Sequence, residues 1–372
     1  MARNINSRLE HLTQRRRGTD RLGRLTTDAQ REILAKSVAN EAWQTRSNQP
    51  YTRYALGSMQ EVGPEYTRIS VETAERVGKQ LAASISNVEF KLQGSVPLNA
   101  HIRGVSDVDL LTLDTSMLLY ETHGVRGQQG GYYPTTKTSL GVLHDLRFNV
   151  ERVLPISFPA ATVDKSGGKA VSISGGSLAR PVDVVPSHWH DTAAYQLYGL
   201  EHDRGVYILN RKVPETIKNL PFLHIKMIAD RCDGVWGGLR KAIRLCKNVK
   251  ADAISEETEI AFPSFDIAAT MFHADMEALK MGYFYELRIL GETQRFLDVL
   301  YHNEGYAKSL RVPDGSRAIF DTNIKYEAMK KLSFEMDDLV KEVAREQRPS
   351  LQSQDGLLVQ PSRDAIWSLN VP

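Results

Sequence analysis

The stretch QGSVPLNAHIRGVSDVDLL, residues 93–111, predicts the fold of the chain around it. It places the pair Gly94-Ser95 ahead of Asp107 and Asp109, two aspartates separated by one residue. An isolated Asp-x-Asp is common and most often marks a solvated turn. Here the alternating apolar residues of NVEFKL lead into the glycine, and VSDVDLLTLD has the composition of a second strand. We therefore predict a strand, a Gly-Ser turn and a second strand that carries the aspartates.

The two aspartates are expected to share one face of their strand. Side chains alternate along a strand, so Asp107 and Asp109 point to one side, and Val108 and Leu110 point to the other. A third carboxylate, Asp183, interrupts the apolar strand ARPVDVVPS, where a lone charge is costly unless something pairs with it. Three convergent carboxylates supply the oxygen ligands that Mg²⁺ prefers, and without a cation they would repel one another.

The flanking sequence predicts a mixed α/β region followed by helices. Apolar residues recur at three- and four-residue steps over residues 71–85, and again in KTSLGVLHDLRFNVERVL, which indicates two amphipathic helices. Three short strands, FPAATVD, KAVSIS and ARPVDVVPS, follow with turn residues between them. The Gly-rich residues 124–136 suit a surface loop or a mobile lid. Beyond residue 210 we expect helices over residues 214–232, 236–249, 264–281, 284–302 and 324–347.

The composition is that of a globular chain large enough for one bilobal core. Of the 372 residues 41% are apolar, and 47 Lys and Arg balance 45 Asp and Glu. This balance disfavours a protein that grips many phosphates of a long nucleic acid. No apolar run approaches the roughly 18 residues needed to span a bilayer. The two cysteines build neither a disulfide framework nor a four-cysteine zinc site, so we expect a cytoplasmic protein without membrane contacts.

Two features near the N-terminus are interpreted as structural. Arginines crowd the first residues, and such a run is more often a solvated arm than a binding site. These arginines are Arg15, Arg16, Arg17, Arg21 and Arg24. A second Gly-Ser pair, Gly57-Ser58, has no Asp-x-Asp after it and is predicted to be a loop.

Other side chains with a functional appearance are also given structural interpretations. His188 and His190 share a strand face, but no third ligand has matching spacing, which favours a hydrogen-bonded pair over a metal site. Cys232 and Cys246 are expected to be packed thiols. The aromatic run MGYFYELRIL is predicted to be core.

The order of these motifs carries a resemblance. A strand, a Gly-Ser turn, an Asp-x-Asp strand and a distant apolar-Asp-apolar strand form the signature of the polymerase-β-like nucleotidyltransferases. Within that superfamily the chain resembles the bacterial cGAS/DncV-like nucleotidyltransferases, or CD-NTases, over most of residues 26–300. The segments RPVDVVPS, GGLRKAIRLCKNVKAD and PSFDIAATMF carry the later part of the resemblance.

The resemblance implies an α+β, mixed α/β fold. It would consist of a bilobal polymerase-β-like nucleotidyltransferase core with a mixed sheet and a helical C-terminal lobe. We expect a basic N-terminal arm over residues 1–25 and a catalytic lobe over residues 26–210. A helical, OAS-like lobe would follow over residues 211–347, and residues 348–372 would form a tail that is mobile or draped over the surface.

The resemblance also implies roles for individual residues. Asp107 and Asp109 would bind two Mg²⁺ ions, with Mn²⁺ as an alternative, and Asp183 would help to activate the acceptor hydroxyl. Nucleotide binding is assigned to Gly94, Ser95, Lys247, Ser264, Phe265 and Arg244. Of these, Phe265 would stack on a base, and Gly94, Ser95, Lys247 and Ser264 would hold the donor triphosphate.

A basic stripe gives independent but ambiguous support for this assignment. Arg240, Arg244 and Lys247 follow one another at four- and three-residue steps, which places them on one face of a helix. Such a stripe serves either as a phosphate clamp or as a solvated face, and the two interpretations weigh equally here.

The resemblance predicts an enzyme that joins nucleoside triphosphates, with release of pyrophosphate, into a cyclic or linear oligonucleotide messenger in anti-phage (CBASS) signalling. ATP and GTP are the favoured substrates, with pyrimidine nucleotides as alternatives. A defence-operon regulator and an effector that binds the product are the expected partners. One alternative is nucleotide transfer to an RNA, tRNA or protein acceptor, and another is an inactive nucleotide-binding scaffold.

Overall fold

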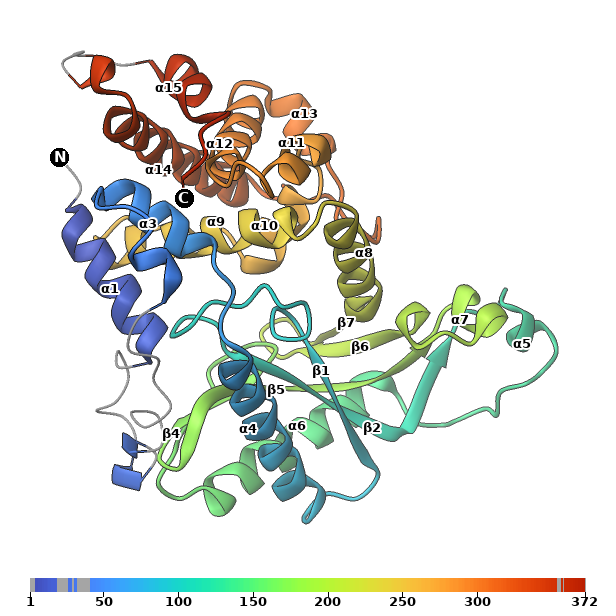
Figure 1. Ribbon diagram of the computed structural model, residues 1–372. Helices are drawn as coiled ribbons and strands as arrows, with labels where there is room; N and C mark the ends of the chain where they lie inside the picture. Colours follow the sequence, from blue (N-terminus) through green and yellow to red (C-terminus); the bar gives the residue numbers. More distant parts are fainter. Residues whose placement is uncertain are drawn as a thin grey trace.

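The computed structural model describes residues 4–18, 26–28, 30–31, 41–352, 356 and 358–371. Figure 1 shows that these residues form one lobe built around a β-sheet and one lobe made of helices. The predicted mixed α/β fold with a helical C-terminal lobe is confirmed. None of the helices in the described part of the chain is long and apolar enough to cross a membrane.

A mixed sheet forms the centre of the first lobe. Its strands are β1 (Val88–Gln93), β2 (Val108–Tyr120), β3 (Thr162–Asp164), β4 (Val171–Gly175), β5 (Leu178–Asp191), β6 (Gly205–Asn210) and β7 (Glu215–Asn219). The strand order is β1-β2-β5-β4-β3, and β6 pairs with the far half of β5 and with β7. β2 and β5 are parallel, whereas the other neighbours are antiparallel. The pairing of β2 with β5 brings distant parts of the sequence side by side.

The helices cover this sheet and build the second lobe. They are α1 (Ile5–Arg17), α3 (Pro50–Met59), α4 (Pro64–Ala82), α5 (Val125–Gln128), α6 (Ser139–Ser157), α7 (Ala193–Tyr198), α8 (Pro221–Gly234), α9 (Gly238–Ser255), α10 (Ser264–Met271), α11 (Met276–Met281), α12 (Leu287–His302), α13 (Glu304–Ser309), α14 (Asn323–Gln347) and α15 (Val359–Ile366). Of these, α4 and α6 pack against the sheet.

The two faces of the sheet bury different side chains. Val108 and Leu110 lie in a hydrophobic cluster with residues of α4 and α6. Leu111 belongs to a second cluster with residues of β6. Because strand side chains alternate, Asp109 shares the side of Leu111 and points away from α4 and α6. β5 repeats this pattern around Asp183, whose neighbours Val182 and Val184 lie in the first cluster.

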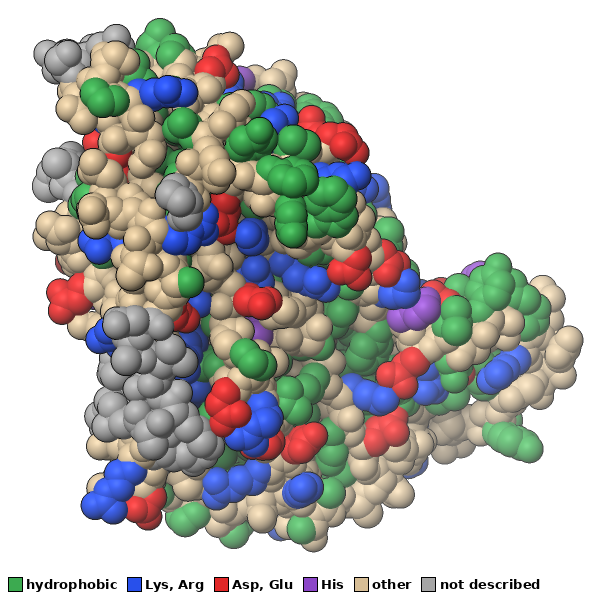
Figure 2. All heavy atoms as spheres, viewed as in Figure 1, with side chains coloured by type: hydrophobic (Ala, Val, Ile, Leu, Met, Phe, Trp, Pro, Cys, Tyr) green, Lys and Arg blue, Asp and Glu red, His purple; other side chains and the backbone are tan. Residues whose placement is uncertain are grey.

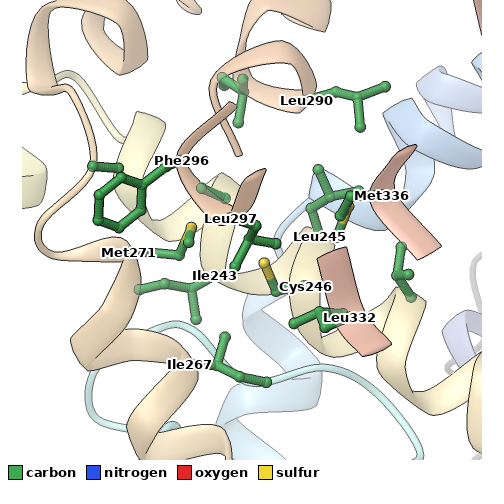
Figure 3. Close-up of a cluster of buried hydrophobic side chains, with 14 of the residues drawn as sticks. Ile243, Leu245, Cys246, Ile267, Met271, Leu290, Phe296, Leu297, Leu332 and Met336 are labelled. Carbon is green, nitrogen blue, oxygen red and sulfur yellow. The ribbon is translucent and has the colours of Figure 1, made fainter. Parts of the chain in front are cut away.

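Helix α9 is the central element of the helical lobe. Its side chains are buried over most of residues 238–253, so it is surrounded by the other helices rather than lying on the surface. Figure 3 shows Ile243, Leu245 and Cys246 of α9 packed among apolar side chains of α10, α12 and α14. Both cysteines are buried free thiols, as predicted. A helix enclosed in this way is a rigid base for the side chains that it directs toward the other lobe.

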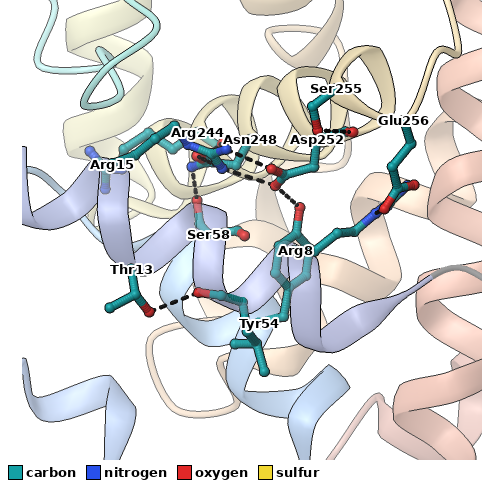
Figure 4. Close-up of polar contacts among 11 residues, drawn as sticks. Arg8, Thr13, Arg15, Tyr54, Ser58, Arg244, Asn248, Asp252, Ser255 and Glu256 are labelled. Carbon is teal, nitrogen blue, oxygen red and sulfur yellow. Dashed lines mark hydrogen bonds and ion pairs between the residues drawn. The ribbon is translucent and has the colours of Figure 1, made fainter. Parts of the chain in front are cut away.

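The N-terminal arginines correct one prediction. Arg15 and Arg16 are buried, so the solvated-arm interpretation is wrong for them. The Arg15 guanidinium contacts the Asp252 carboxylate of α9 at 2.6 Å (Figure 4). Arg16 pairs with Glu41. Their partners lie far away in the sequence, beyond the reach of a local pattern. Arg21 and Arg24 lie outside the described residues.

Local structure differs from the predictions in three further places. Gly57-Ser58 lies inside α3 rather than in a loop, with Gly57 against the Trp43 ring. The predicted helix 214–232 begins instead as β7, which forms a hairpin with β6. The predicted helix 264–281 is divided into α10 and α11, and the Asp275 side chain caps the second.

The C-terminal tail and the aromatic run also differ. Residues 358–371 form α15 and a short extension that pack on α14, and Ile366 is fully buried. The core prediction for MGYFYELRIL holds for Leu287, Ile289 and Leu290 but is wrong for Tyr283 and Phe284, which are exposed.

Candidate active site

The predicted aspartates lie together on two neighbouring strands. In the parallel pairing of β2 with β5, Asp109 is directly opposite Asp183. Asp107 immediately precedes β2, two residues from Asp109. Both strands are apolar on either side of these residues, so burial of the apolar neighbours in the sheet determines where the carboxylates lie.

The turn after β1 is fitted closely against this carboxylate pair. Gly94 has a φ of +77°, a left-handed conformation that favours glycine. A Cβ at this position would lie 2.2 Å from Asp109 Oδ2. The backbone of the Gly-Ser turn therefore approaches the Asp109 carboxylate more closely than any side chain would permit.

The carboxylates are in mutual repulsion. Burial raises the pKa of Asp109 to about 7, and the neighbouring Asp183 and Asp107 carboxylates add to the effect. Lys247 opposes it, and burial lowers the pKa of the Lys247 ammonium to about 7. A cation bound beside Asp109 would reverse this destabilisation of its charged form.

The carboxylates are not arranged as a finished metal centre. No group of three or more His, Cys, Asp or Glu side chains in the described parts of the chain is arranged to hold a metal ion. Asp183 accepts a hydrogen bond from the Ser172 hydroxyl of the adjacent strand β4. The donor set still suits Mg²⁺, because carboxylates from two strands meet at one place and carry unfavourable charge.

A pocket of about 300 Å³ extends from Asp109 into the helical lobe. It brings together most of the residues predicted to bind the nucleotide, from the turn after β1, from α9 and from α10, with Asp109 of β2. Those in its wall are Gly94, Ser95, Asp109, Lys247, Ser264 and Phe265. Arg244 is not in the wall, because its guanidinium donates to the carbonyls of Met59 and Asn99, each at 2.9 Å.

The far end of the pocket is aromatic. The Phe265 ring stacks on the imidazole of His224 from α8, with centroids 3.9 Å apart and an interplanar angle of 19°. Arg317 lies over the Phe265 ring, at 5.2 Å from its centroid. Sequence reasoning missed His224, because an isolated histidine in the segment PFLHIKMIAD carries no motif and only the fold brings it to the pocket.

His224 is neutral at pH 7. Burial lowers the pKa of its imidazole to about 4. Its Nδ1 atom is buried and has no hydrogen-bond partner among the described residues. A neutral imidazole has one donor and one acceptor nitrogen, so the aromatic end of the pocket also has polar groups.

Two other candidate features lie away from this pocket. The His188 imidazole contacts the Ser139 hydroxyl at 2.6 Å and the Trp189 carbonyl at 2.9 Å, which supports the predicted structural role. The Gly-rich residues 124–136 extend from the sheet near α7 and do not line the pocket (Figure 1). They form the short helix α5 followed by a surface loop, in which Tyr132 stacks on Tyr120.

The surface agrees with the balanced composition. On the face drawn in Figure 2, acidic and basic side chains are interspersed over both lobes. This face therefore offers no broad basic surface of the kind that holds a long nucleic acid.

Comparisons with known proteins identify the family. No family model matches the chain. A cyclic dinucleotide synthase CdnE from Yersinia aleksiciae is 42% identical to this chain, in an alignment that covers 92% of this chain and 93% of the relative. A c-di-GMP synthase from Capnocytophaga granulosa is 31% identical to this chain, in an alignment that covers 73% of this chain and 81% of the relative. The solved structure of a STING-associated CdnE c-di-GMP synthase from Capnocytophaga granulosa matches 91% of this chain and 97% of its own, with 26% identity and a TM-score of 0.68. The chain therefore belongs to the CdnE-type cyclic dinucleotide synthases of the CD-NTase family, which are nucleotidyltransferases with a polymerase-β-like fold.

Proposed function

We propose that this chain joins two nucleoside triphosphates into a cyclic dinucleotide and that Asp107, Asp109 and Asp183 are its catalytic carboxylates. The observation that carries the proposal is the register of β2 and β5, which sets Asp109 opposite Asp183 beside the Gly94 turn. Family membership supplies the reaction class, and the site supplies the residues.

The three aspartates would hold divalent cations, with Mg²⁺ as the first candidate and Mn²⁺ as the alternative. Such cations, when bound, would lower the pKa of an attacking ribose hydroxyl and neutralise charge on the triphosphate. The raised pKa of Asp109 supports this assignment, because burial and the Asp183 and Asp107 carboxylates disfavour a charged form that a bound cation would stabilise. The Ser172 hydroxyl would restrict the orientation of Asp183.

The chain's own groups would hold the donor nucleotide along the pocket. The backbone amides of the Gly94-Ser95 turn can approach phosphate oxygens closely, and the Ser95 hydroxyl can donate to them. Lys247 and Ser264, which lies at the first turn of α10, would contact the same triphosphate. The base would then lie against the Phe265 and His224 rings at the aromatic end.

The relatives favour a purine substrate. Two curated relatives that are 29% and 31% identical are named c-di-GMP synthases, so we propose GTP as a substrate, with ATP next. The solved relative is described as STING-associated, and we propose by analogy that the product is bound by an effector protein.

The test is incubation of the purified protein with α-labelled NTPs and Mg²⁺ or Mn²⁺. Phosphatase treatment and mass spectrometry then identify the product that survives. The wild type is expected to form a phosphatase-resistant cyclic dinucleotide, and Asp109→Asn is expected to form none. The matched control is Asp114→Asn on the same strand, outside the pocket wall, which should keep activity. Full synthesis by Asp109→Asn would refute the assignment of the site.

A further inference from the structure

The segment between the Gly-Ser turn and Asp107 is irregular. Residues 94–107 contain turns and no helix or strand. They nevertheless form much of the pocket wall, because Leu98 and Ala100 line it and are buried. Its internal backbone hydrogen bonds are local turns, from Asn99 N to Val96 O, from Ala100 N to Ser95 O and from Ser106 N to Ile102 O. Such turns fix the local path of the chain, and contacts with other elements fix where the segment lies.

Three consecutive carbonyls of this segment accept hydrogen bonds from the basic stripe of α9. The bonds are Arg240 Nε to Leu98 O at 2.9 Å, Arg244 Nη1 to Asn99 O at 2.9 Å and Lys247 Nζ to Ala100 O at 3.0 Å. Lys247 also donates to the Ser106 hydroxyl at 2.9 Å, next to Asp107. Residues four and three apart on a helix lie in a row, and the carbonyls of residues 98–100 accept from that row in chain order.

Helix α9, which carries the stripe, is held in place by contacts with α1 and α3. On the next turns of α9, Asn248 donates to the Ser58 carbonyl, and the Asp252 carboxylate accepts from Arg15 and from the Tyr54 hydroxyl (Figure 4). The Arg244 guanidinium also bridges to the Met59 carbonyl of α3. Hydrogen bonds from charged donors are stronger than neutral ones, so the row ties the segment to a rigid helix.

We propose that Arg240 and Arg244 are positioning residues that fix residues 98–100 and, through them, the Gly94-Ser95 turn and Asp107. They act neither as a phosphate clamp nor as a solvated face. The inference rests on the proposed function, because its effect on kcat is measured as synthesis of the cyclic dinucleotide. It adds that the helical lobe sets the geometry of the catalytic lobe through backbone carbonyls.

The test compares three variants at Arg240 and its ion-pair partner Asp233. Arg240 is only partly buried, so its replacement should leave the fold intact, unlike that of Arg244. Arg240→Ala removes both the bond to Leu98 O and the ion pair with Asp233 at 3.2 Å. Asp233→Ala removes the ion pair alone. Arg240→Lys keeps a charged donor that can reach the carbonyl.

Arg240→Ala is expected to lower kcat by roughly tenfold to 100-fold, because misplacement of reacting groups by about 1 Å costs of that order. The KM for NTP should change less than kcat. Hydrogen exchange of the amides in residues 96–106 should become faster without nucleotide or metal. Asp233→Ala should match the wild type in both measurements, and Arg240→Lys should recover part of kcat.

Equal kcat and equal exchange in Arg240→Ala and Asp233→Ala would overturn the inference. A fall in thermal stability alone, with kcat and exchange unchanged, would overturn it as well. If the wild type makes no cyclic product, the proposed function fails instead. The exchange comparison needs no turnover and would still decide whether Arg240 positions the segment.

Discussion

Gly94 combines a positive φ with a close approach to a predicted catalytic carboxylate. Gly94→Ala would place a methyl group 2.2 Å from Asp109 Oδ2 in a backbone of positive φ, so we expect product formation to fall by more than about 100-fold. Gly130→Ala is the matched control, because Gly130 has a φ of +67° and open space around a Cβ. Product yield for the two variants separates the collision with Asp109 from backbone strain, and equal yields would contradict the prediction.

His224 predicts a pH effect on stability. Its pKa is about 4 in the folded chain and about 6.5 when unfolded, so the unfolded state binds the proton more readily between these values. The stability from neutral His224 is complete above pH 6.5 and is lost as the pH falls toward 4. His224→Phe retains an aromatic ring on Phe265 and should lose less stability between pH 7 and pH 5. Urea unfolding at both pH values measures this, and equal losses in the variant and the wild type would refute it.

The contact between α1 and α9 makes a prediction at the element scale. Arg15→Met would leave the Asp252 carboxylate buried without its guanidinium, and the expected loss is roughly 3–5 kcal/mol of unfolding free energy. Arg17→Met, on the exposed side of the same helix, should cost much less. Denaturant unfolding of both variants provides the measurement. A similar small loss for both would mean that the ion pair adds little.

Local patterns predicted the elements that carry the carboxylates. Period-two alternation located β1, β-branched and apolar composition located β2, and the apolar flanks of Asp183 located β5. The parallel pairing of β2 with β5, which sets Asp109 opposite Asp183, joins segments far apart in the sequence and is contained in none of these patterns. The hairpin β6–β7 was missed because ETIKN is short and polar enough to merge with the following helix. The burial of Arg15 depends on a partner 237 residues away, which no local pattern contains.

The residues of the candidate site could be predicted where they form motifs or follow from the family resemblance. The Gly-Ser turn and aspartates form motifs, and Lys247 and Ser264 follow from the family resemblance. His224 comes to the pocket only through the packing of α8 against α10. The stripe of Arg240 and Arg244 was visible, but its carbonyl partners depend on the path of an irregular segment. The predicted domain boundaries remain predictions.

At the scale of the whole molecule, both ends of the described chain pack on the helical lobe (Figure 1). Leu9 and Leu12 of α1 and Ile366 of α15 belong to one hydrophobic core. Deletion of residues 358–372 should therefore lower the unfolding temperature by several degrees, because it uncovers part of this core. Differential scanning calorimetry of the truncated and full chains tests this. An unchanged unfolding temperature would show that α15 is dispensable.

This shared core has a consequence for biosynthesis. α1 leaves the ribosome before α15, which belongs to the same hydrophobic core and is made only after about 350 further residues have been added. The strands β1 to β7 are complete by residue 219, so the sheet can assemble while the helical lobe is still being translated. Arg240, Arg244 and Lys247 of α9 can donate to the carbonyls of residues 98–100 only after residue 247 has left the ribosome. The nascent sheet lobe is thus expected to carry its three aspartates well before the pocket beside them is complete.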